Sequence, residues 1–336
     1  MRYKLLGSSG LRVSEIGLGT MTFGETKGWG ADAAQSAAIM SAYADAGGVL
    51  LDTAPNYAGS ESEKIVGAFT RGRRRDFVIS TKYTGSGAAH VLAGGNSRLS
   101  ITRSVEDSLR RLESDHIDLF WLHYWDGTTP IYEILRALDD LVSAGKILYV
   151  GFSDTPAWLV SRAVTMAEGR GWIRPAAIQI EYNLANRDAE RELLQMADAL
   201  DLGAMCWGPL AAGALAGGAD PKRRAKLPPH LAEIAMNLNA LAKQTGMGAS
   251  ALALRWLLRH PARRALVPLI GARTAEQLTQ TLAAADGDLD AQTITALDAL
   301  APPALGFPHE MIASPYLRKL ALGQPNALDA PQKPRG

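Results

Sequence analysis

Polar and ionisable side chains stand at the ends of several short apolar runs in this sequence. Asp52, Lys82 and His123 each end or directly follow such a run, and Tyr57 comes five residues after Asp52. Carboxylate, amine, imidazole and phenol groups are the ones with which proteins commonly transfer protons. Each residue alone is common in structural roles, but their joint occurrence at successive run ends indicates an acid–base site. Four more candidates end or directly follow later runs: Ser153, Asp154, Gln179 and Trp207.

The apolar runs alternate with amphipathic helical segments, and this alternation predicts the fold. Ile101, Val105, Leu109 and Leu112 show the helical spacing of three or four residues. Repeated βα units predict parallel strands that close into a (β/α)8 (TIM) barrel, with catalytic groups at the C-terminal strand ends. The eight expected strands span residues 16–20, 49–52, 77–81, 117–122, 147–152, 176–180, 203–207 and 265–270.

A doubly wound fold is the alternative, and it would need a phosphate-binding loop. The segment from Gly85 to Gly87 lacks a third glycine, and no Walker-type motif occurs. We therefore expect one barrel domain over residues 1–336, with its core at about 15–300 and a partly ordered tail at 301–336. Residues 5–13 predict a hairpin that plugs the barrel floor. Thr155 is expected to cap a helix and Pro156 to be its first residue. The Gly- and Pro-rich segment 208–229 is expected to be a functional loop.

Composition narrows the class of protein. The 336 residues are 47% hydrophobic with a net charge of +1, which argues against a nucleic-acid partner. No run suits a signal peptide or a membrane span. Cys206 is the single cysteine and is expected to be buried, and the histidines other than His123 lack metal-ligand spacing, so no metal is expected. These features predict a cytoplasmic enzyme with a small-molecule substrate, and a homo-oligomer is compatible with them.

Seven separated segments resemble the aldo-keto reductases, and the resemblance runs from about Tyr3 to Ala285. Asp52, Tyr57, Lys82 and His123 are similar to the catalytic tetrad of that family. Residues 121–126 and 153–158 resemble its aryl-alcohol dehydrogenase-like branch. The matching segments are 17–21, 51–57, 80–82, 118–123, 145–153, 179–183 and 270–274.

The resemblance implies an NADPH-dependent reduction of aldehydes or ketones to alcohols. The nicotinamide would give a hydride, and Tyr57 would give a proton to the growing alkoxide. A cation beside a tyrosine lowers its pKa, so Lys82 would tune Tyr57, and Asp52 would fix Lys82 by an ion pair. His123 would orient the substrate carbonyl.

The resemblance also implies a cofactor site. Arg273 is placed to contact the 2′-phosphate, and Trp207 to stack on the nicotinamide. Gln277 is similar to an adenosine contact, although its spacing from Thr274 also fits a capping box. The full cofactor set is Gly19, Thr20, Met21, Asp52, Ser153, Asp154, Gln179, Trp207, Gly208, Pro209, Leu210, Gly213, Leu215, Ile270, Gly271, Ala272, Arg273 and Gln277, with Asn183 as either a contact or a loop cap.

Two positions depart from the family pattern, and the substrate stays open. Thr281 stands where an asparagine is common, and Ala58 where a glycine is common. Aryl aldehydes, quinones, keto-sugars and polycyclic ketones are the candidate substrates. The expected substrate contacts are Trp29, Tyr57, Tyr83, His123, Tyr124 and Trp125. The alternatives are an NADPH-binding partner protein similar to channel β subunits and a Schiff-base aldolase that uses Lys82.

Overall fold

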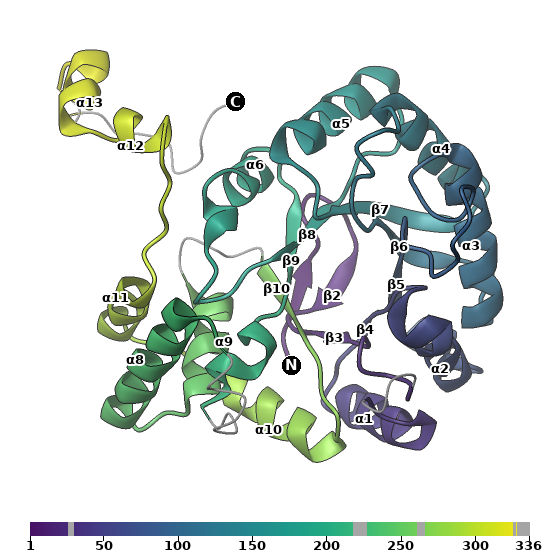
Figure 1. The fold of residues 1–336 in the computed structure, drawn as a ribbon, viewed down its shortest axis with the longest axis horizontal. Helices are drawn as coiled ribbons and strands as arrows, with labels where there is room; N and C mark the ends of the chain where they lie inside the picture. The colour runs from purple at the N-terminus through teal and green to yellow at the C-terminus, as the bar shows by residue number, and fades with distance from the viewer. Residues whose placement is uncertain (26–29, 218–226, 261–265, 325–326, 328–336) are drawn as a thin grey trace.

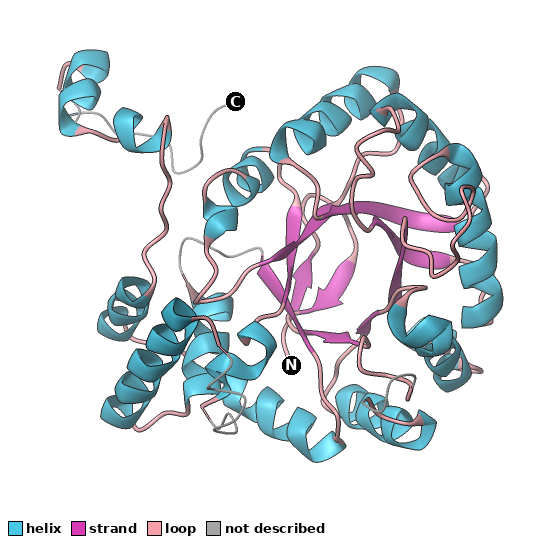
Figure 2. Ribbon diagram, viewed as in Figure 1, coloured by secondary structure: helices cyan, strands magenta, loops and turns pink. Residues whose placement is uncertain are grey.

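A closed barrel of eight parallel strands forms the centre of the molecule, with helices around it (Figures 1 and 2). The computed structural model describes residues 1–25, 30–217, 227–260, 266–324 and 327. The strands follow one another in chain order, and the last pairs with the first, which confirms the (β/α)8 barrel. They are β3 (Gly17–Gly19), β4 (Leu50–Asp52), β5 (Val78–Tyr83), β6 (Ile117–Leu122), β7 (Ile147–Ser153), β8 (Ala177–Glu181), β9 (Gly203–Trp207) and β10 (Leu266–Ile270).

All eight strands lie within the expected runs or one to two residues beyond them. Residue 265, the expected start of the last strand, lies outside the described residues. The loop expected at 208–229 is described on both sides of residues 218–226.

The helices up to α11 cover the outside of the barrel by burying one face each, whereas α12 and α13 have no buried residue. In α3, Ile101, Val105 and Leu112 are buried, and the Ser97 hydroxyl caps the helix by accepting from the Ser100 N–H. The helices are α1 (Ala33–Asp45), α2 (Glu61–Thr70), α3 (Arg98–Leu112), α4 (Ile131–Ser143), α5 (Ala157–Arg170), α6 (Leu193–Ala199), α8 (Pro229–Thr245), α9 (Ala249–Arg259), α10 (Ala275–Ala285), α11 (Ala291–Leu300), α12 (His309–Ile312) and α13 (Pro315–Leu322), with short 3-10 turns η1 (Tyr57–Ser60), η2 (Arg74–Asp76), η3 (Asp188–Glu190) and η4 (Ala211–Ala216).

The expected start of α5 is wrong by one residue. Pro156 is the cap residue, and Ala157 is the first helical one. The Thr155 hydroxyl donates to the Ser153 carbonyl at 2.7 Å, so it does not cap the helix.

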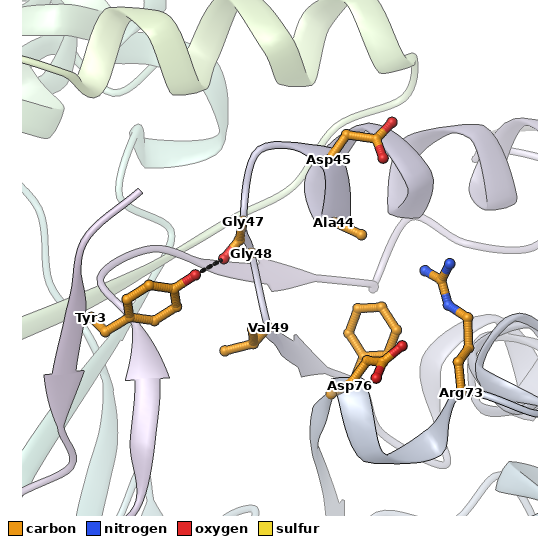
Figure 3. Close-up of a pocket in the computed structure, with 9 residues that line it drawn as sticks. Tyr3, Ala44, Asp45, Gly47, Gly48, Val49, Arg73 and Asp76 are labelled. Carbon is orange, nitrogen blue, oxygen red and sulfur yellow. Dashed lines mark hydrogen bonds between the residues drawn. The ribbon is translucent and has the colours of Figure 1, made fainter.

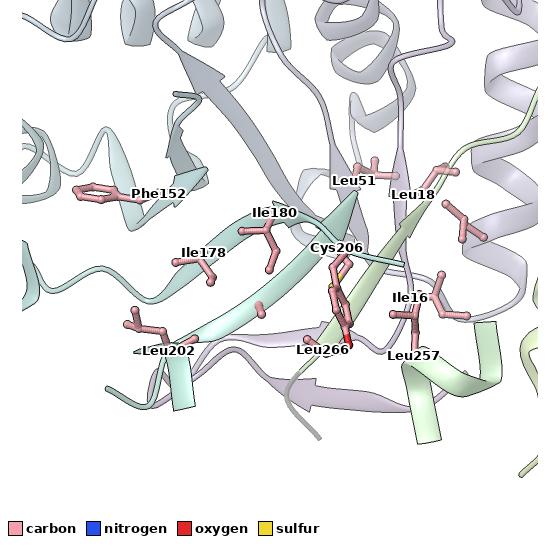
Figure 4. Close-up of a cluster of buried hydrophobic side chains, with 14 of the residues drawn as sticks. Ile16, Leu18, Leu51, Phe152, Ile178, Ile180, Leu202, Cys206, Leu257 and Leu266 are labelled. Atoms are coloured by element: carbon pink, nitrogen blue, oxygen red, sulfur yellow. The ribbon is translucent and has the colours of Figure 1, made fainter. Parts of the chain in front are cut away.

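The core has two layers, because successive side chains of a strand point to opposite faces. The inner layer fills the barrel and includes Leu50, Trp121 and Met205. The outer layer lies between strands and helices; Figure 4 shows part of it, with Cys206 buried among Ile16, Leu257 and Leu266. The burial of Cys206 is as expected.

An N-terminal hairpin closes the floor of the barrel, as predicted. β1 (Tyr3–Leu5) pairs antiparallel with β2 (Arg12–Ser14), and Leu6 and Val13 are fully buried in the inner layer. Gly7 has φ +60°, and a Cβ there would lie 2.5 Å from the Gly203 nitrogen. The hairpin therefore packs tightly against the start of β9.

The tail contains two short helices that lie away from the barrel in Figure 1. The tail was expected to be partly ordered, and in its described part it forms the helices α12 and α13. His309 Nε2 lies 3.0 Å from Glu192 Oε1 and connects the tail to the segment before α6. Of the helices in the described parts of the chain, none combines the length and the apolar character that a membrane crossing requires.

Candidate active site

Three neighbouring strands bring the four predicted catalytic residues to one end of the barrel. Asp52 is the last residue of β4, Lys82 is the last but one residue of β5, and His123 directly follows β6. Tyr57 begins η1 in the loop after β4. Asp52 pairs with Ser80 and Lys82 with Trp121 in the parallel register, so all four residues meet at the C-terminal mouth.

Asp52 and Lys82 form a buried ion pair. Lys82 Nζ lies 2.6 Å from Asp52 Oδ2, and their side chains are 0% and 3% exposed. Lys82 also donates to the Thr53 carbonyl at 2.8 Å. Burial alone would lower the pKa of Lys82, but the Asp52 carboxylate reverses this effect and the pKa lies above its ordinary value. The amine is therefore held as an ammonium ion.

Asp52 has two further side-chain partners, Ser80 and Gln179. The Ser80 hydroxyl donates to Oδ1 of Asp52 at 2.6 Å, and Gln179 Nε2 donates to the same oxygen at 3.0 Å. Ser80 lies two residues before Lys82, so strand periodicity places both side chains on the inner face. This spacing is the signal by which Ser80 could have been found. Gln179 was assigned to the cofactor, but here it orients the carboxylate.

Tyr57 lies beside the ammonium group. Lys82 Nζ is 4.9 Å from the centroid of the Tyr57 ring. Burial raises the pKa of Tyr57, and the Lys82 charge opposes this without cancelling it. The expectation that Lys82 favours the phenolate is right in direction, but the pKa of Tyr57 as a whole is raised. Tyr57 is thus a protonated phenol next to a cation.

His123 completes the group as a neutral imidazole. Its ring stands edge-on to Tyr57, with centroids 6.2 Å apart. Burial and then the Lys82 charge lower the pKa of His123 to about 4. Nδ1 is buried and has no hydrogen-bond partner among the described residues. At neutral pH one ring nitrogen of His123 carries a proton that can be donated.

The ends of β7 and β9 supply a second group of side chains at the mouth. The Ser153 hydroxyl is buried and finds no partner within the described parts of the chain. The Trp207 indole N–H donates to Asp154 Oδ1 at 3.1 Å, and Trp207 is 37% exposed. Burial raises the pKa of Asp154, against the effect of this hydrogen bond. A partly exposed indole and an unpartnered hydroxyl therefore stand beside the four predicted catalytic residues.

The loop after β9 is held from β8. Asn183 Nδ2 donates to the Gly208 carbonyl at 3.0 Å, while its Oδ1 accepts from the backbone N–H groups of Ala185 and Asn186. These contacts match the loop-cap alternative for Asn183. Gly208 and Gly213 have φ of +64° and +90°, the left-handed region that glycine adopts readily. Of the other expected contacts here, Leu215 is buried in the core, and Pro209 and Leu210 lie in the loop.

The end of β10 runs into the exposed start of α10. The Thr274 hydroxyl accepts from the Gln277 N–H at 3.1 Å, and Gln277 Oε1 accepts from the Arg273 N–H at 2.9 Å. Gln277 thus caps the N-terminus of α10. In a capping box its side chain would accept from the Thr274 N–H, whereas here it accepts from the Arg273 N–H. Arg273 is exposed and forms no ion pair with any described residue. Thr281 donates to the Gln277 carbonyl at 2.8 Å.

The remaining cofactor candidates flank this strand. Thr20 is fully buried, and its hydroxyl donates to the Asp52 carbonyl at 2.9 Å, so its side chain supports Asp52. Met21 is 54% exposed. A Cβ on Gly271 would lie 3.7 Å from the Gly19 carbonyl. Ile270 and Ala272 are buried, with Ala272 accepting from Thr22 at 3.0 Å.

The substrate predictions divide into three cases. Tyr124 is 43% exposed beside His123, with ring centroids 5.4 Å apart, and Trp125 packs edge-on against Trp158. Tyr83 is a correction: it is fully buried and stacks on Phe120 in the outer layer, because it adjoins the inward-pointing Lys82 on the same strand. Trp29 lies outside the described residues.

A hollow at the other end of the barrel is separate from this site. It has a volume of about 220 Å³ and lies beside the hairpin and the start of β4 (Figure 3). Tyr3 donates to the Gly47 carbonyl at 2.9 Å there, and the Arg73 guanidinium lies over the rings of Phe69 and Phe77. We assign it no function. No metal-binding group of His, Cys, Asp or Glu occurs in the described portion of the chain.

Comparison with known proteins agrees with this geometry. The model of the aldo/keto reductase family matches residues 15–302. A norsolorinic acid reductase of Aspergillus flavus is 35% identical over 90% of this chain and 82% of its own. A putative aryl-alcohol dehydrogenase of Saccharomyces cerevisiae is 32% identical over 91% and 88%. The family match, the barrel and the four residues at its mouth agree, and the chain belongs to the aldo/keto reductase family of oxidoreductases.

Proposed function

We propose that this protein is an NADPH-dependent reductase that converts aldehydes or ketones to alcohols, with Tyr57 as the proton donor. One observation carries the proposal: a protonated Tyr57 lies between a buried ammonium, Lys82, and a neutral His123. Reduction of a carbonyl needs a hydride at carbon and a proton at oxygen. The three side chains can supply the second of these requirements.

The roles follow from the contacts. NADPH, when bound, would supply the hydride for the carbonyl carbon. As charge develops on the substrate oxygen, the Tyr57 hydroxyl transfers its proton to it, and the alcohol results. Lys82 stabilises the phenolate that Tyr57 becomes, and Asp52 keeps Lys82 in place. His123 donates a hydrogen bond to the same oxygen and orients the carbonyl.

Several residues support NADPH as the hydride source. The unpartnered Ser153 hydroxyl and the partly exposed indole of Trp207 suit a carboxamide and an aromatic ring, respectively. Arg273 is exposed beside the start of α10, where a phosphate is favoured by both the guanidinium and the helix N-terminus. We propose that Arg273 binds the 2′-phosphate.

Aromatic carbonyl compounds are the proposed substrates: aryl aldehydes, quinones or polycyclic ketones, with keto-sugars as a further class. Tyr124 and Trp125 at the mouth support a flat, apolar substrate. The names of the relatives, which include an aryl-alcohol dehydrogenase of Pestalotiopsis microspora that is 31% identical, point in the same direction.

The test is NADPH consumption against a panel of these carbonyls, with NADH as a control and Tyr57→Phe as the inactive reference. Turnover that prefers NADPH and needs the Tyr57 hydroxyl is the expected result. Slow turnover with every carbonyl, despite tight NADPH binding, would favour a binding-partner function. A Schiff-base aldolase is disfavoured, because Lys82 is a buried ammonium and not a free amine.

A further inference from the structure

Two loops at the mouth of the barrel are joined by reciprocal hydrogen bonds. One loop, residues 84–97, follows β5, and the other, residues 123–130, follows β6. The Asn96 N–H donates to Asp126 Oδ2 at 2.8 Å, and the Asp126 N–H donates to Asn96 Oδ1 at 2.7 Å. We name this pair the Asn96–Asp126 clamp.

Asn96 uses its remaining donors within the same two loops. It is fully buried, and its Nδ2 donates to Thr84 Oγ1 at 2.7 Å and to the Tyr124 carbonyl at 3.4 Å. Thr84 lies two residues after Lys82, and Tyr124 directly follows His123. The Asn96 amide therefore contacts Thr84 and Tyr124, which lie just beyond the predicted catalytic residues Lys82 and His123.

Asp126 organises the second loop around its carboxylate. Oδ1 accepts from the N–H groups of Thr128 and Thr129 at 2.9 and 2.8 Å, and Oδ2 accepts from the Thr129 hydroxyl at 2.7 Å. Partial burial would raise the pKa of Asp126, but the hydrogen bonds from Thr129, Thr128 and Asn96 lower it to about 2. The carboxylate is thus an acceptor for every bond at working pH.

The clamp also holds a strained backbone. Thr84 has φ +101°, which is unfavourable for a β-branched residue, and it is buried. Gly94 has φ +89°, and a Cβ there would lie 2.6 Å from the Thr84 carbonyl. Strain of this kind persists only where the surroundings enforce it, and it concentrates at functional sites.

The second loop carries the aromatic rim of the mouth. The Trp125 indole N–H donates to the Thr129 carbonyl at 3.3 Å, and its ring stands edge-on to Trp158 with centroids 5.7 Å apart. Trp125 is thus fixed by the same short turn that Asp126 organises. The Tyr124 ring lies beside His123.

We propose that Asn96 and Asp126 are positioning residues that hold Tyr124 and Trp125 in the orientation that binds an aromatic carbonyl substrate. The proposal rests on the proposed reductase function. Neither residue touches the substrate in this proposal; each acts through the loop. Loss of the clamp should therefore weaken substrate binding while the proton transfer from Tyr57 stays intact.

The decisive variant is Asp126→Ala, with Asp290→Ala as the matched control. Asp290 is an exposed carboxylate that also accepts a backbone N–H, from Thr293 at 2.6 Å, but it caps α11. We expect Asp126→Ala to raise KM for an aryl aldehyde about tenfold, with kcat within about twofold and the NADPH Kd unchanged. Asp126→Asn keeps one acceptor oxygen and should give an intermediate KM, whereas Asp290→Ala should leave KM unchanged.

Hydrogen exchange separates this proposal from the proposed function. In the wild type the N–H groups of Asn96, Asp126, Thr128 and Thr129 should be protected, and in Asp126→Ala they should exchange at least tenfold faster. An unchanged KM, with or without faster exchange, overturns the positioning role in an active enzyme. If the wild type reduces no carbonyl, the proposed function fails, and unchanged exchange then overturns the clamp as well. Should Asp126→Ala not fold, Thr129→Val removes one bond to Asp126 and is measured in the same way.

Discussion

Lys82 Nζ lies 4.9 Å from the centroid of the Tyr57 ring, and Lys82 is completely buried. A buried ammonium is costly unless it is paired, and Asp52 provides the pairing. Because burial keeps the pKa of Tyr57 above its ordinary value, the phenol is protonated at neutral pH. In the proposed reaction the same ammonium would stabilise the phenolate, so one arrangement would both hold and release the proton.

Removal of the Tyr57 hydroxyl should abolish reduction and leave the fold intact. Tyr57→Phe keeps the ring beside Lys82 and His123 but has no proton to donate. General acid catalysis contributes about 10²- to 10⁴-fold, so kcat/KM should fall by at least that factor. Titration with NADPH, followed by tryptophan fluorescence, should give an unchanged Kd. Retained turnover would refute the role of Tyr57.

Removal of Lys82 should destabilise the protein more than removal of the ion pair as a whole. Lys82→Met leaves the buried Asp52 carboxylate without its cation, which costs about 3–5 kcal/mol of unfolding free energy. The double variant Lys82→Met with Asp52→Asn carries no unpaired charge and should recover part of that loss. Urea denaturation of both proteins measures the difference. A double variant that is no more stable than the single one would contradict the unpaired-charge explanation.

His123 should make the protein less stable in mild acid. Its pKa of about 4 in the folded protein lies below the ordinary 6.5, so between these values the unfolded chain binds more protons. Unfolding free energy should therefore fall as the pH drops from about 6.5 to about 4, by up to about 3 kcal/mol. His123→Gln should lose this contribution, whereas His90→Gln, at an exposed histidine, should keep it. Thermal denaturation at pH 7 and pH 4.5 compares the three proteins.

The barrel and the meeting of Asp52, Tyr57, Lys82 and His123 at its mouth were predictable because their signals are local. Apolar runs with a polar residue at the end define a strand and its C-terminal residue, and a closed parallel barrel places all such ends at one mouth. Tyr83 was assigned wrongly because strand alternation was not applied: it adjoins Lys82 and must point outward. The same rule would have found Ser80.

The Asn96–Asp126 clamp had no such signal. Its residues are thirty positions apart, and their contact depends on left-handed backbone at Thr84 and Gly94. Neither periodicity nor propensity predicts these conformations in a loop. The two tail helices were not predicted for a related reason, since α12 and α13 are too short to show a clear period.

Arg273 should decide between NADPH and NADH. A hydrogen bond to a charged group contributes about 1.5–3 kcal/mol, so Arg273→Leu should raise the NADPH Kd about 10- to 100-fold and leave the NADH Kd unchanged. Gln277→Ala tests whether Gln277 contacts the cofactor or only caps α10. Its side-chain oxygen accepts from the Arg273 N–H, which fits the capping role. If Gln277 serves only the helix start, Tm falls while the preference for NADPH stays. An Arg273→Leu protein with unaltered NADPH affinity would remove Arg273 from the cofactor site.

Ala58, where the family commonly has glycine, should cost the protein stability. Its φ of +47° lies in the left-handed region, which costs an alanine roughly 1–2 kcal/mol. Ala58→Gly removes this strain, but the glycine also adds about 0.4–1 kcal/mol of freedom to the unfolded chain. The net result should be a gain of about 0.5–1 kcal/mol in unfolding free energy. The control is Ala46→Gly, at an exposed position with φ −78°, where the same change should be destabilising. Urea denaturation measures the stability of both variants, and kcat should be measured as well because Tyr57 is adjacent to Ala58. If Ala58→Gly and Ala46→Gly destabilise the protein equally, the backbone at Ala58 carries no strain.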